Sequence, residues 1–338
     1  MTGRRVARRP RGTLCPLSAV QGDPTVTALF LLGGHPERYR VSVSTESRSE
    51  RAHIAPADLD AAIGDVDWTV PPPGSTASRF SAPSGELAVV SLGDPAHPRV
   101  VLVPGATGSK EDFALMLPLL AEAGFFVQSF DLAGQYESHA AGAHTSYTYE
   151  LFIGDLIAFL EADSPAHLLG YSFAGTVAQL VAVRRPDLVL SLALLTTPPG
   201  VGNVFATMKW LGPIAPIASP RRGAGLMIWG IVTNKNRVPP RRLEFVRSRF
   251  ALTRRRSVDE IVGLMMAAPD VRDRVRALPI PKLVVAGSHD LWPLAAHERY
   301  AHDIGADFRA YATGHSPSET TPHQLTADLL DLYARADG

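Results

Sequence analysis

The sequence contains a serine, an aspartate and a histidine in contexts that suit nucleophilic attack on a carbonyl group. Ser172 lies in the stretch 170–175, Gly-Tyr-Ser-Phe-Ala-Gly, between small residues. Asp290 ends the stretch Ala-Gly-Ser-His-Asp, and His315 lies in the stretch Ala-Thr-Gly-His-Ser-Pro. A serine hydroxyl becomes a useful nucleophile when an imidazole takes its proton and a carboxylate orients that imidazole. The chain order Ser, Asp, His therefore predicts acyl-transfer chemistry.

A glycine-containing stretch upstream of Ser172 has a composition that suits an oxyanion-binding loop. Residues 103–109 read Val-Pro-Gly-Ala-Thr-Gly-Ser and follow an apolar run. Glycines let backbone amides come close to a substrate oxygen, and such amides stabilise the negative charge of a tetrahedral intermediate. An ordinary strand-to-helix turn is the alternative interpretation of this stretch.

Each of these stretches follows a predicted strand, and the strands alternate with predicted helices. The apolar patterns predict strands at 86–92, 99–103, 125–130, 167–169, 189–195, 282–286 and 307–311. They predict helices at 110–123, 149–162, 177–185, 294–304 and 322–334. This alternation indicates an α/β fold with right-handed crossovers and a largely parallel sheet that helices cover on both faces. Reactive groups gather at the carboxyl ends of strands in such a sheet, which is where the three residues are predicted to lie.

Two regions depart from the alternation. Between about Gly200 and Leu278 no buried strand is predicted, so this mostly helical stretch is an insertion between two core strands. Residues 1–75 are heterogeneous and end at Pro71-Pro72-Pro73-Gly74, which reads as a rigid boundary. Within them, Pro56 to Ile63 has a helical pattern with a stop at Gly64. Their role is left open.

The motifs resemble those of the α/β-hydrolase superfamily over residues 76–338. The resemblance rests on the stretches 170–175, 104–109 and 287–290, and on Gly314-His315 followed by Glu319 and Pro322. It implies an α/β-hydrolase fold, with a mostly parallel eight-stranded sheet, helices on both faces and a helical lid insertion. We therefore expect an N-terminal extension at 1–75, a core at 76–200 and 276–338, and a lid at 201–275.

The resemblance also implies a role for each residue of the predicted site. Ser172 would be the nucleophile, His315 the general base and then acid, and Asp290 the carboxylate that orients His315. The backbone amides of Ala106 and Phe173 would bind the oxyanion, and no cofactor is implied.

The sequence departs from the family pattern at three places. Pro104 stands where the common loop has histidine, Ala174 replaces the second glycine beside the serine, and residues 131–138 lack the usual arginine and second glycine. None of these departures removes a catalytic group.

A serine at position 172 narrows the reaction. Family members that open epoxides or remove halide use an aspartate there, so the resemblance favours substrates with an acyl group. We expect a cofactor-independent, carboxylesterase-like serine hydrolase that cleaves a carboxylic ester or lactone through an acyl-enzyme on Ser172. Carbon–carbon bond hydrolysis or thioester cleavage on the same three residues remains an alternative. A slow-turnover ligand-binding or sensor protein is a second one.

The insertion is strongly basic. Between residues 203 and 258 there are twelve Lys and Arg residues, with Glu244 the single acidic residue. Pairing with acidic residues of the core, steering of an anionic substrate, and contact with anionic lipid or another acidic partner are three competing interpretations. The stretch 241–256 is predicted to be one amphipathic helix with Leu243, Val246 and Phe250 facing inward.

Apolar residues of the insertion are candidates for a substrate pocket above Ser172. Met208, Trp210 and Trp229 would suit a small-molecule substrate with an apolar acyl or aromatic group. Packing of the insertion on the core is the alternative role for these side chains.

Composition excludes several other classes of protein. The 338 residues contain 33 Lys and Arg and 33 Asp and Glu, which argues against a nucleic-acid binder. The single cysteine, Cys15, excludes an intramolecular disulfide and a cysteine-based zinc site. No apolar run reaches the ~18 residues of a membrane span, and no signal sequence is evident, so a cytoplasmic location is expected. His297, His302 and His323 are expected to be exposed on helices, no metal site is predicted, and the oligomeric state is left open.

Overall fold

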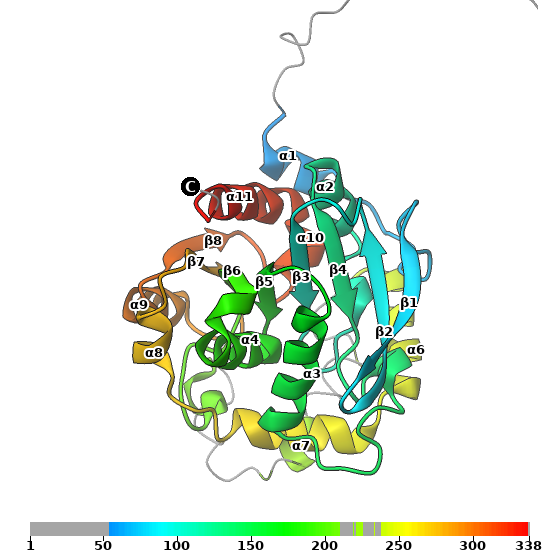
Figure 1. Cartoon of the computed structure of the whole chain (residues 1–338), viewed down its shortest axis with the longest axis vertical. Helices are drawn as coiled ribbons and strands as arrows, with labels where there is room; N and C mark the ends of the chain where they lie inside the picture. The colour runs from blue at the N-terminus through cyan, green and yellow to red at the C-terminus, as the bar shows by residue number, and fades with distance from the viewer. Residues whose placement is uncertain (1–53, 210–218, 220, 226–232, 234–237, 337–338) are drawn as a thin grey trace, which may run out of the picture. The chain divides into compact units, whose positions relative to one another are not determined.

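The computed structural model of the chain describes residues 54–209, 219, 221–225, 233 and 238–336. Trp210 and Trp229, which we predicted to line the substrate pocket, lie outside these described residues. The described chain is built on one eight-stranded sheet with the strand order β1-β2-β4-β3-β5-β6-β7-β8 (Figure 1). The strands are β1 (Thr76–Ala82), β2 (Gly85–Leu92), β3 (Arg99–Val103), β4 (Phe126–Phe130), β5 (Ala166–Tyr171), β6 (Val189–Leu195), β7 (Lys282–Gly287) and β8 (Asp307–Tyr311).

The sheet is mostly parallel. Strand β2 pairs antiparallel with both β1 and β4, and every pairing from β4 through β3 to β8 is parallel. The predicted eight-stranded α/β architecture is confirmed. Strand β1 was not predicted, because its residues are mostly exposed and include Ser78, Arg79 and Ser81, which break the apolar pattern.

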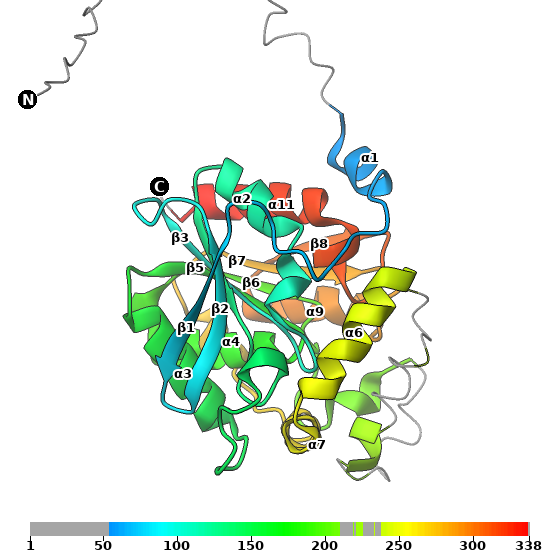
Figure 2. The ribbon, with the colours of Figure 1, turned by 90° about the vertical axis from the view of Figure 1, so that its right-hand side faces the viewer.

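Helices cover both faces of the sheet. The helices of the described residues include α1 (Pro56–Ala61), α2 (Met116–Glu122), α3 (Tyr149–Glu161), α4 (Phe173–Arg184), α6 (Pro240–Leu252), α7 (Arg255–Met265), α8 (Arg272–Arg276), α9 (Leu294–Ile304), α10 (Pro317–Thr320) and α11 (Pro322–Ala334). Leu120 of α2 and Leu329 of α11 bury against one face, whereas Phe152 of α3, Val177 of α4 and Ile304 of α9 bury against the other. Figure 2 shows the α2–α11 layer and the α3–α4 layer on opposite sides of the strands.

The predicted helix 110–123 is interrupted. A short 3-10 helix (Lys110–Phe113) is followed by α2, which begins at Met116. Pro118 explains the break, because a proline lacks an amide hydrogen and is tolerated in the first turn of a helix but not in its interior.

Residues 54–75 pack on the core. The predicted helix in this segment is present as α1, and its Asp60 binds the start of α11. The Asp60 carboxylate accepts hydrogen bonds from the amides of His323, at 2.8 Å, and Gln324, at 3.1 Å. His323 was predicted to be exposed, but its Nδ1 lies 2.9 Å from Asp60 and its side chain is only 27% exposed. The described residues from 54 onwards belong to one compact unit.

The stretch between β6 and β7, which we call the insertion (residues 201–275), is mostly helical where it is described. The predicted single helix 241–256 is two helices, because α6 ends at Leu252 and α7 begins at Arg255 (Figure 2). Its predicted inward face is also wrong in part: α6 buries Arg242, Phe245, Val246 and Arg249, while Leu243 and Phe250 are only partly buried. The two arginines face inward because acidic side chains of the core lie beneath them.

Candidate active site

Ser172 lies in a sharp turn between β5 and α4. Its backbone has φ 52° and ψ −121°, which is a strained conformation for a residue with a side chain. The turn requires glycine at Gly175, where an added Cβ would lie 1.8 Å from the hydroxyl oxygen of Thr197. Ala174, which departs from the family pattern, is fully buried and its methyl group fits among apolar residues. The strand-to-helix turn predicted around Ser172 is therefore present.

The structure brings Ser172, His315 and Asp290 together. His315 follows β8, and its Nε2 lies 3.1 Å from Ser172 Oγ. Asp290 follows β7, and its Oδ1 lies 2.5 Å from His315 Nδ1. Because a carboxylate only accepts hydrogen bonds, Nδ1 carries the proton and Nε2 is left to accept one from the serine hydroxyl. This is the arrangement in which an imidazole can take the proton of an attacking serine.

Burial and hydrogen bonds act in opposite directions on Asp290. The side chain is fully buried, and burial alone would raise its pKa. The charge of His315 and hydrogen bonds from His297 and His315 outweigh burial and hold the pKa of Asp290 well below its usual range. The carboxylate is therefore ionised, as it must be to orient His315 and stabilise an imidazolium.

His297 is a buried neighbour of Asp290 that was not predicted from the sequence. It was predicted to be exposed, but its side chain is fully buried, and its Nε2 lies 2.7 Å from Asp290 Oδ2. The signal was present in the sequence, because His297 precedes the buried Tyr300, Ala301 and Ile304 by three, four and seven residues. That spacing places it on the inward face of α9.

The loop after β3 lies directly against Ser172. A Cβ added to Gly105 would be 2.9 Å from Ser172 Cβ, so the backbone passes the serine at a distance that only glycine permits. Ala106 is the next residue of this loop. Phe173 is the first residue of α4, and the first amides of a helix have no carbonyl partner within it. Both residues predicted to bind the oxyanion are thus next to Ser172, one in space and one in the chain.

Gln135 forms a hydrogen bond with the loop after β3 and was not identified from the sequence. Its fully buried side chain accepts a hydrogen bond from the amide of Thr107 at 3.0 Å. It also donates one to Ser257 Oγ of α7 at 2.6 Å. Thr107 has φ 63°, so this hydrogen bond stabilises a strained residue. Gln135 connects the loop beside Ser172 to the insertion.

A buried cluster of four charges binds α6 to the core. Arg242 donates to Asp112 at 2.7 Å and to Glu319 at 2.5 Å, and Arg249 donates to Asp112 at 2.6 Å. Burial alone would raise the pKa of Asp112, but the charges of Arg249 and Arg242 hold it below its usual range, whereas burial raises the pKa of Glu319. The guanidinium of Arg242 also lies over the ring of Trp68, at 4.4 Å. These arginines pair with acidic residues of the core, as the first interpretation of the basic insertion expected.

Trp292 packs against His315 from within the protein. Its ring centre is 5.9 Å from that of His315, and its indole nitrogen donates to the carbonyl oxygen of Val204 in the insertion at 2.8 Å. Met208, which we predicted to line a pocket, is partly buried and packs against the core. The chain next to Met208 lies close to the site, because the amide of Lys209 bonds to the carbonyl of Leu291 at 3.2 Å.

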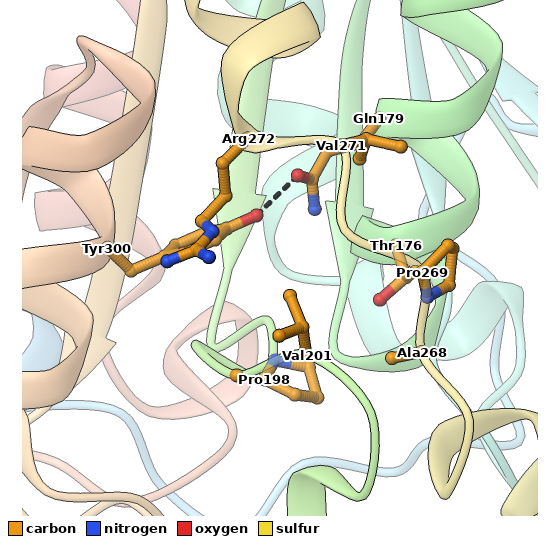
Figure 3. A pocket seen from close by; sticks show the side chains of 10 residues that line it. Thr176, Gln179, Pro198, Val201, Ala268, Pro269, Val271, Arg272 and Tyr300 are labelled. Carbon is orange, nitrogen blue, oxygen red and sulfur yellow. Dashed lines mark hydrogen bonds between the residues drawn. The ribbon is translucent and has the colours of Figure 1, made fainter.

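A small cavity lies on the α4 and α9 side of the sheet, apart from these groups. Figure 3 shows Gln179 and Tyr300 among its lining residues, joined by a hydrogen bond, with Arg272 alongside. Ser172, Asp290 and His315 are not among its lining residues. Within the described ranges, no group of three or more His, Cys, Asp or Glu side chains could hold a metal ion. None of the helices in those ranges has the length and apolar character that crossing a bilayer requires.

Comparison with known proteins agrees with the observed fold. Residues 98–308 match the family model described as alpha/beta hydrolase fold. Among curated proteins, the chain is 27% identical over 210 residues to bifunctional epoxide hydrolase 2 of Sus scrofa, a match that covers 54% of this chain and 38% of that protein. The chain thus spans about two fifths of the length of this relative.

Two solved structures are similar in fold. A hydrolase from Pseudomonas aeruginosa PA01 superposes with a TM-score of 0.62 at 22% identity, over 76% of this chain and 98% of its own. The enol-lactonase from Burkholderia xenovorans LB400 superposes with a TM-score of 0.59 at 22% identity, over 76% of this chain and 100% of its own.

Proposed function

Because the chain belongs to the α/β-hydrolase family, we propose that it is a serine hydrolase that cleaves a carboxylic ester or lactone through an acyl-enzyme on Ser172. The observation that carries this proposal is the continuous hydrogen-bonded series from Ser172 Oγ through His315 to Asp290. It leaves His315 Nε2 facing the serine hydroxyl, with an ionised carboxylate on the other side of the ring.

The reaction proceeds in two halves. Ser172 Oγ attacks the carbonyl carbon while His315 Nε2 takes the hydroxyl proton, and the amides of Ala106 and Phe173 stabilise the oxyanion. The intermediate collapses, the alcohol oxygen leaves with the proton from His315, and an ester on Ser172 remains. Water then attacks this ester with His315 again as base, which releases the acid and restores the serine.

The serine distinguishes this chain chemically from an enzyme that opens epoxides through an enzyme-bound carboxylate. A carboxylate that attacks an epoxide carbon forms an ester, which water can hydrolyse at its carbonyl group. A serine oxygen that attacks the same carbon would form an ether, which has no carbonyl group for water to attack. Ser172 therefore favours acyl substrates over epoxides, although the curated relative is called an epoxide hydrolase.

Hydrolysis of a panel of acyl esters and lactones of graded size tests the proposal. Wild type is compared with Ser172→Ala and with Ser288→Ala, an exposed serine as the matched control. We expect sustained turnover in wild type and in the control, and a loss of at least about 10³-fold in Ser172→Ala. Turnover that survives in Ser172→Ala would contradict the proposal. A single stoichiometric burst without further turnover would favour a sensor protein. Activity confined to thioesters would show that the protein is a thioesterase.

A further inference from the structure

We propose that His297 is a positioning residue, which fixes the carboxylate of Asp290 by donating a hydrogen bond from Nε2 to the oxygen that His315 does not use. The inference rests on the proposed function for its catalytic consequence, and on the geometry of the described residues for the contact itself.

Three donors reach the two oxygens of Asp290, and they come from different directions. Oδ1 accepts from His315 Nδ1 at 2.5 Å and from the amide of Leu291 at 2.7 Å. Oδ2 accepts from His297 Nε2 at 2.7 Å. A carboxylate held at both oxygens cannot rotate about its Cβ–Cγ bond without breaking one of these bonds. His297 therefore keeps Oδ1 directed at His315.

The surroundings of His297 identify its tautomer. Its side chain is fully buried, and its Nδ1 has no hydrogen-bond partner among the residues that the structure describes. A proton on Nδ1 would leave a buried donor without an acceptor. A lone pair on Nε2 would face the anionic oxygen of Asp290. The arrangement that satisfies both constraints is a neutral imidazole with its proton on Nε2.

Removal of the His297 donor would leave Oδ2 buried and charged without a partner among the described residues. The carboxylate would then turn towards another donor or bind a proton, and either change weakens its hold on His315. His297 thus orients Asp290 by a hydrogen bond, as Asp290 orients His315. Since Asp290 itself would remain, the expected loss is a part of the 10²–10⁴-fold that general-base catalysis typically supplies.

The first test uses the unmodified protein and does not depend on activity. Two-bond proton–nitrogen NMR of protein labelled with ¹⁵N-histidine reports which ring nitrogen of each histidine carries the proton. His297→Gln assigns the His297 signal by its disappearance. We expect the Nε2–H tautomer for His297, with a deshielded proton. A proton on Nδ1 of His297 and an unprotonated Nε2 would overturn the inference.

The second test is the rate at which a fluorophosphonate labels Ser172, measured below the melting temperature of every variant. We expect His297→Leu, which lacks the donor, to react on the order of ten- to a hundredfold more slowly than wild type. His297→Gln, whose carboxamide can present an N–H at a similar distance from the backbone, should recover much of the loss. His302→Leu is the control, because this histidine lies on the same helix with its side chain 85% exposed.

The outcomes separate this inference from the proposed function. If wild type itself fails to react, the proposed function fails and the NMR result still decides the contact. If wild type reacts and His297→Leu reacts within twofold of it, the positioning role is wrong. A variant that melts earlier but keeps the wild-type rate would show that His297 is merely structural.

Discussion

Arg249 of helix α6 donates a hydrogen bond to the buried carboxylate of Asp112 at 2.6 Å, and the same guanidinium nitrogen lies 3.1 Å from Ser109 Oγ. Ser109 ends the loop that passes against Ser172, so a helix of the insertion contacts the loop of the candidate active site through one side chain. We therefore expect the position of α6 to affect catalysis as well as stability.

Replacement of Arg249 should therefore reduce both properties. Arg249→Met leaves Asp112 with one arginine instead of two, and loss of a partner from a buried pair costs about 3 kcal/mol. We expect the free energy of unfolding in urea to fall by roughly that amount, with a lower kcat for ester hydrolysis. Arg241→Met is the control, because Arg241 lies on the same helix and is exposed; its effect should stay within about 0.5 kcal/mol. Equal effects of the two substitutions would refute a specific role for Arg249.

Gln135 offers a second connection to the same loop. Gln135→Leu would leave the amide of Thr107 without its acceptor, at a cost of about 1–3 kcal/mol for a buried unsatisfied group. The hydroxyl of Ser257 would lose its bond to Gln135 and keep the one it donates to the carbonyl oxygen of Ala133. Ser257→Ala removes the other end of the connection. Because Gln135 and Ser257 share one hydrogen bond, the effects of the two substitutions on unfolding should not add in the double variant. Additive effects would show that the two residues act separately.

Asp155 makes a pH-dependent contribution to the free energy of unfolding, and a single substitution can measure it. Its carboxylate accepts hydrogen bonds from the amide and hydroxyl of Ser84, but burial outweighs them and raises the pKa of Asp155 from 3.8 to about 6. A raised folded-state pKa means that the folded protein binds the proton more tightly than the unfolded chain. The stability that Asp155 contributes is therefore fully present below its unfolded pKa and is lost as the pH rises through about 6.

The variant Asp155→Asn removes this titration while keeping a side chain that can bond to Ser84. Its free energy of unfolding relative to wild type should rise by roughly 2 kcal/mol between pH ~4 and pH ~7. Urea unfolding of both proteins across this range measures the difference. A difference that stays constant with pH would contradict the raised pKa.

The contact between α1 and α11 predicts a structural role for residues 54–75. Asp60→Ala would leave the amides of His323 and Gln324 without an acceptor at the start of α11, where loss of a capping side chain costs about 1 kcal/mol. Asp58→Ala is the matched control, since Asp58 lies on the same short helix and is exposed. We expect a lower melting temperature for Asp60→Ala alone. If Asp58→Ala lowers it equally, the contact has no specific effect.

The sequence predicted those parts of the molecule in which local pattern and tertiary environment agree. Strands such as β3 and β6 are continuous apolar runs because both of their faces are buried. The small residues around Ser172 are typical of a tight strand-to-helix turn. Ser172, Asp290 and His315 could therefore be placed at strand ends, and the structure brings them together. The polar neighbours were harder to find.

The residues that escaped prediction are buried polar groups whose partners are remote in the chain. Arg242 and Arg249 occupy the inward face of α6 because Asp112 and Glu319, more than 70 residues away, neutralise them. Gln135 is buried because it bonds to Thr107 and Ser257 on opposite sides. Prediction from the spacing of apolar residues does not identify such positions, since charged and amide side chains are mostly exposed in proteins and are therefore expected at the surface.

In the proposed reaction, His315, oriented by Asp290, makes Ser172 a nucleophile. The most direct test is labelling by a fluorophosphonate, followed by mass spectrometry of the peptide that carries Ser172, in wild type and in His315→Ala. We expect one label per chain on Ser172, with a rate that falls on the order of 10³-fold in His315→Ala. A label on another residue, or a rate on Ser172 that His315→Ala leaves unchanged, would contradict it.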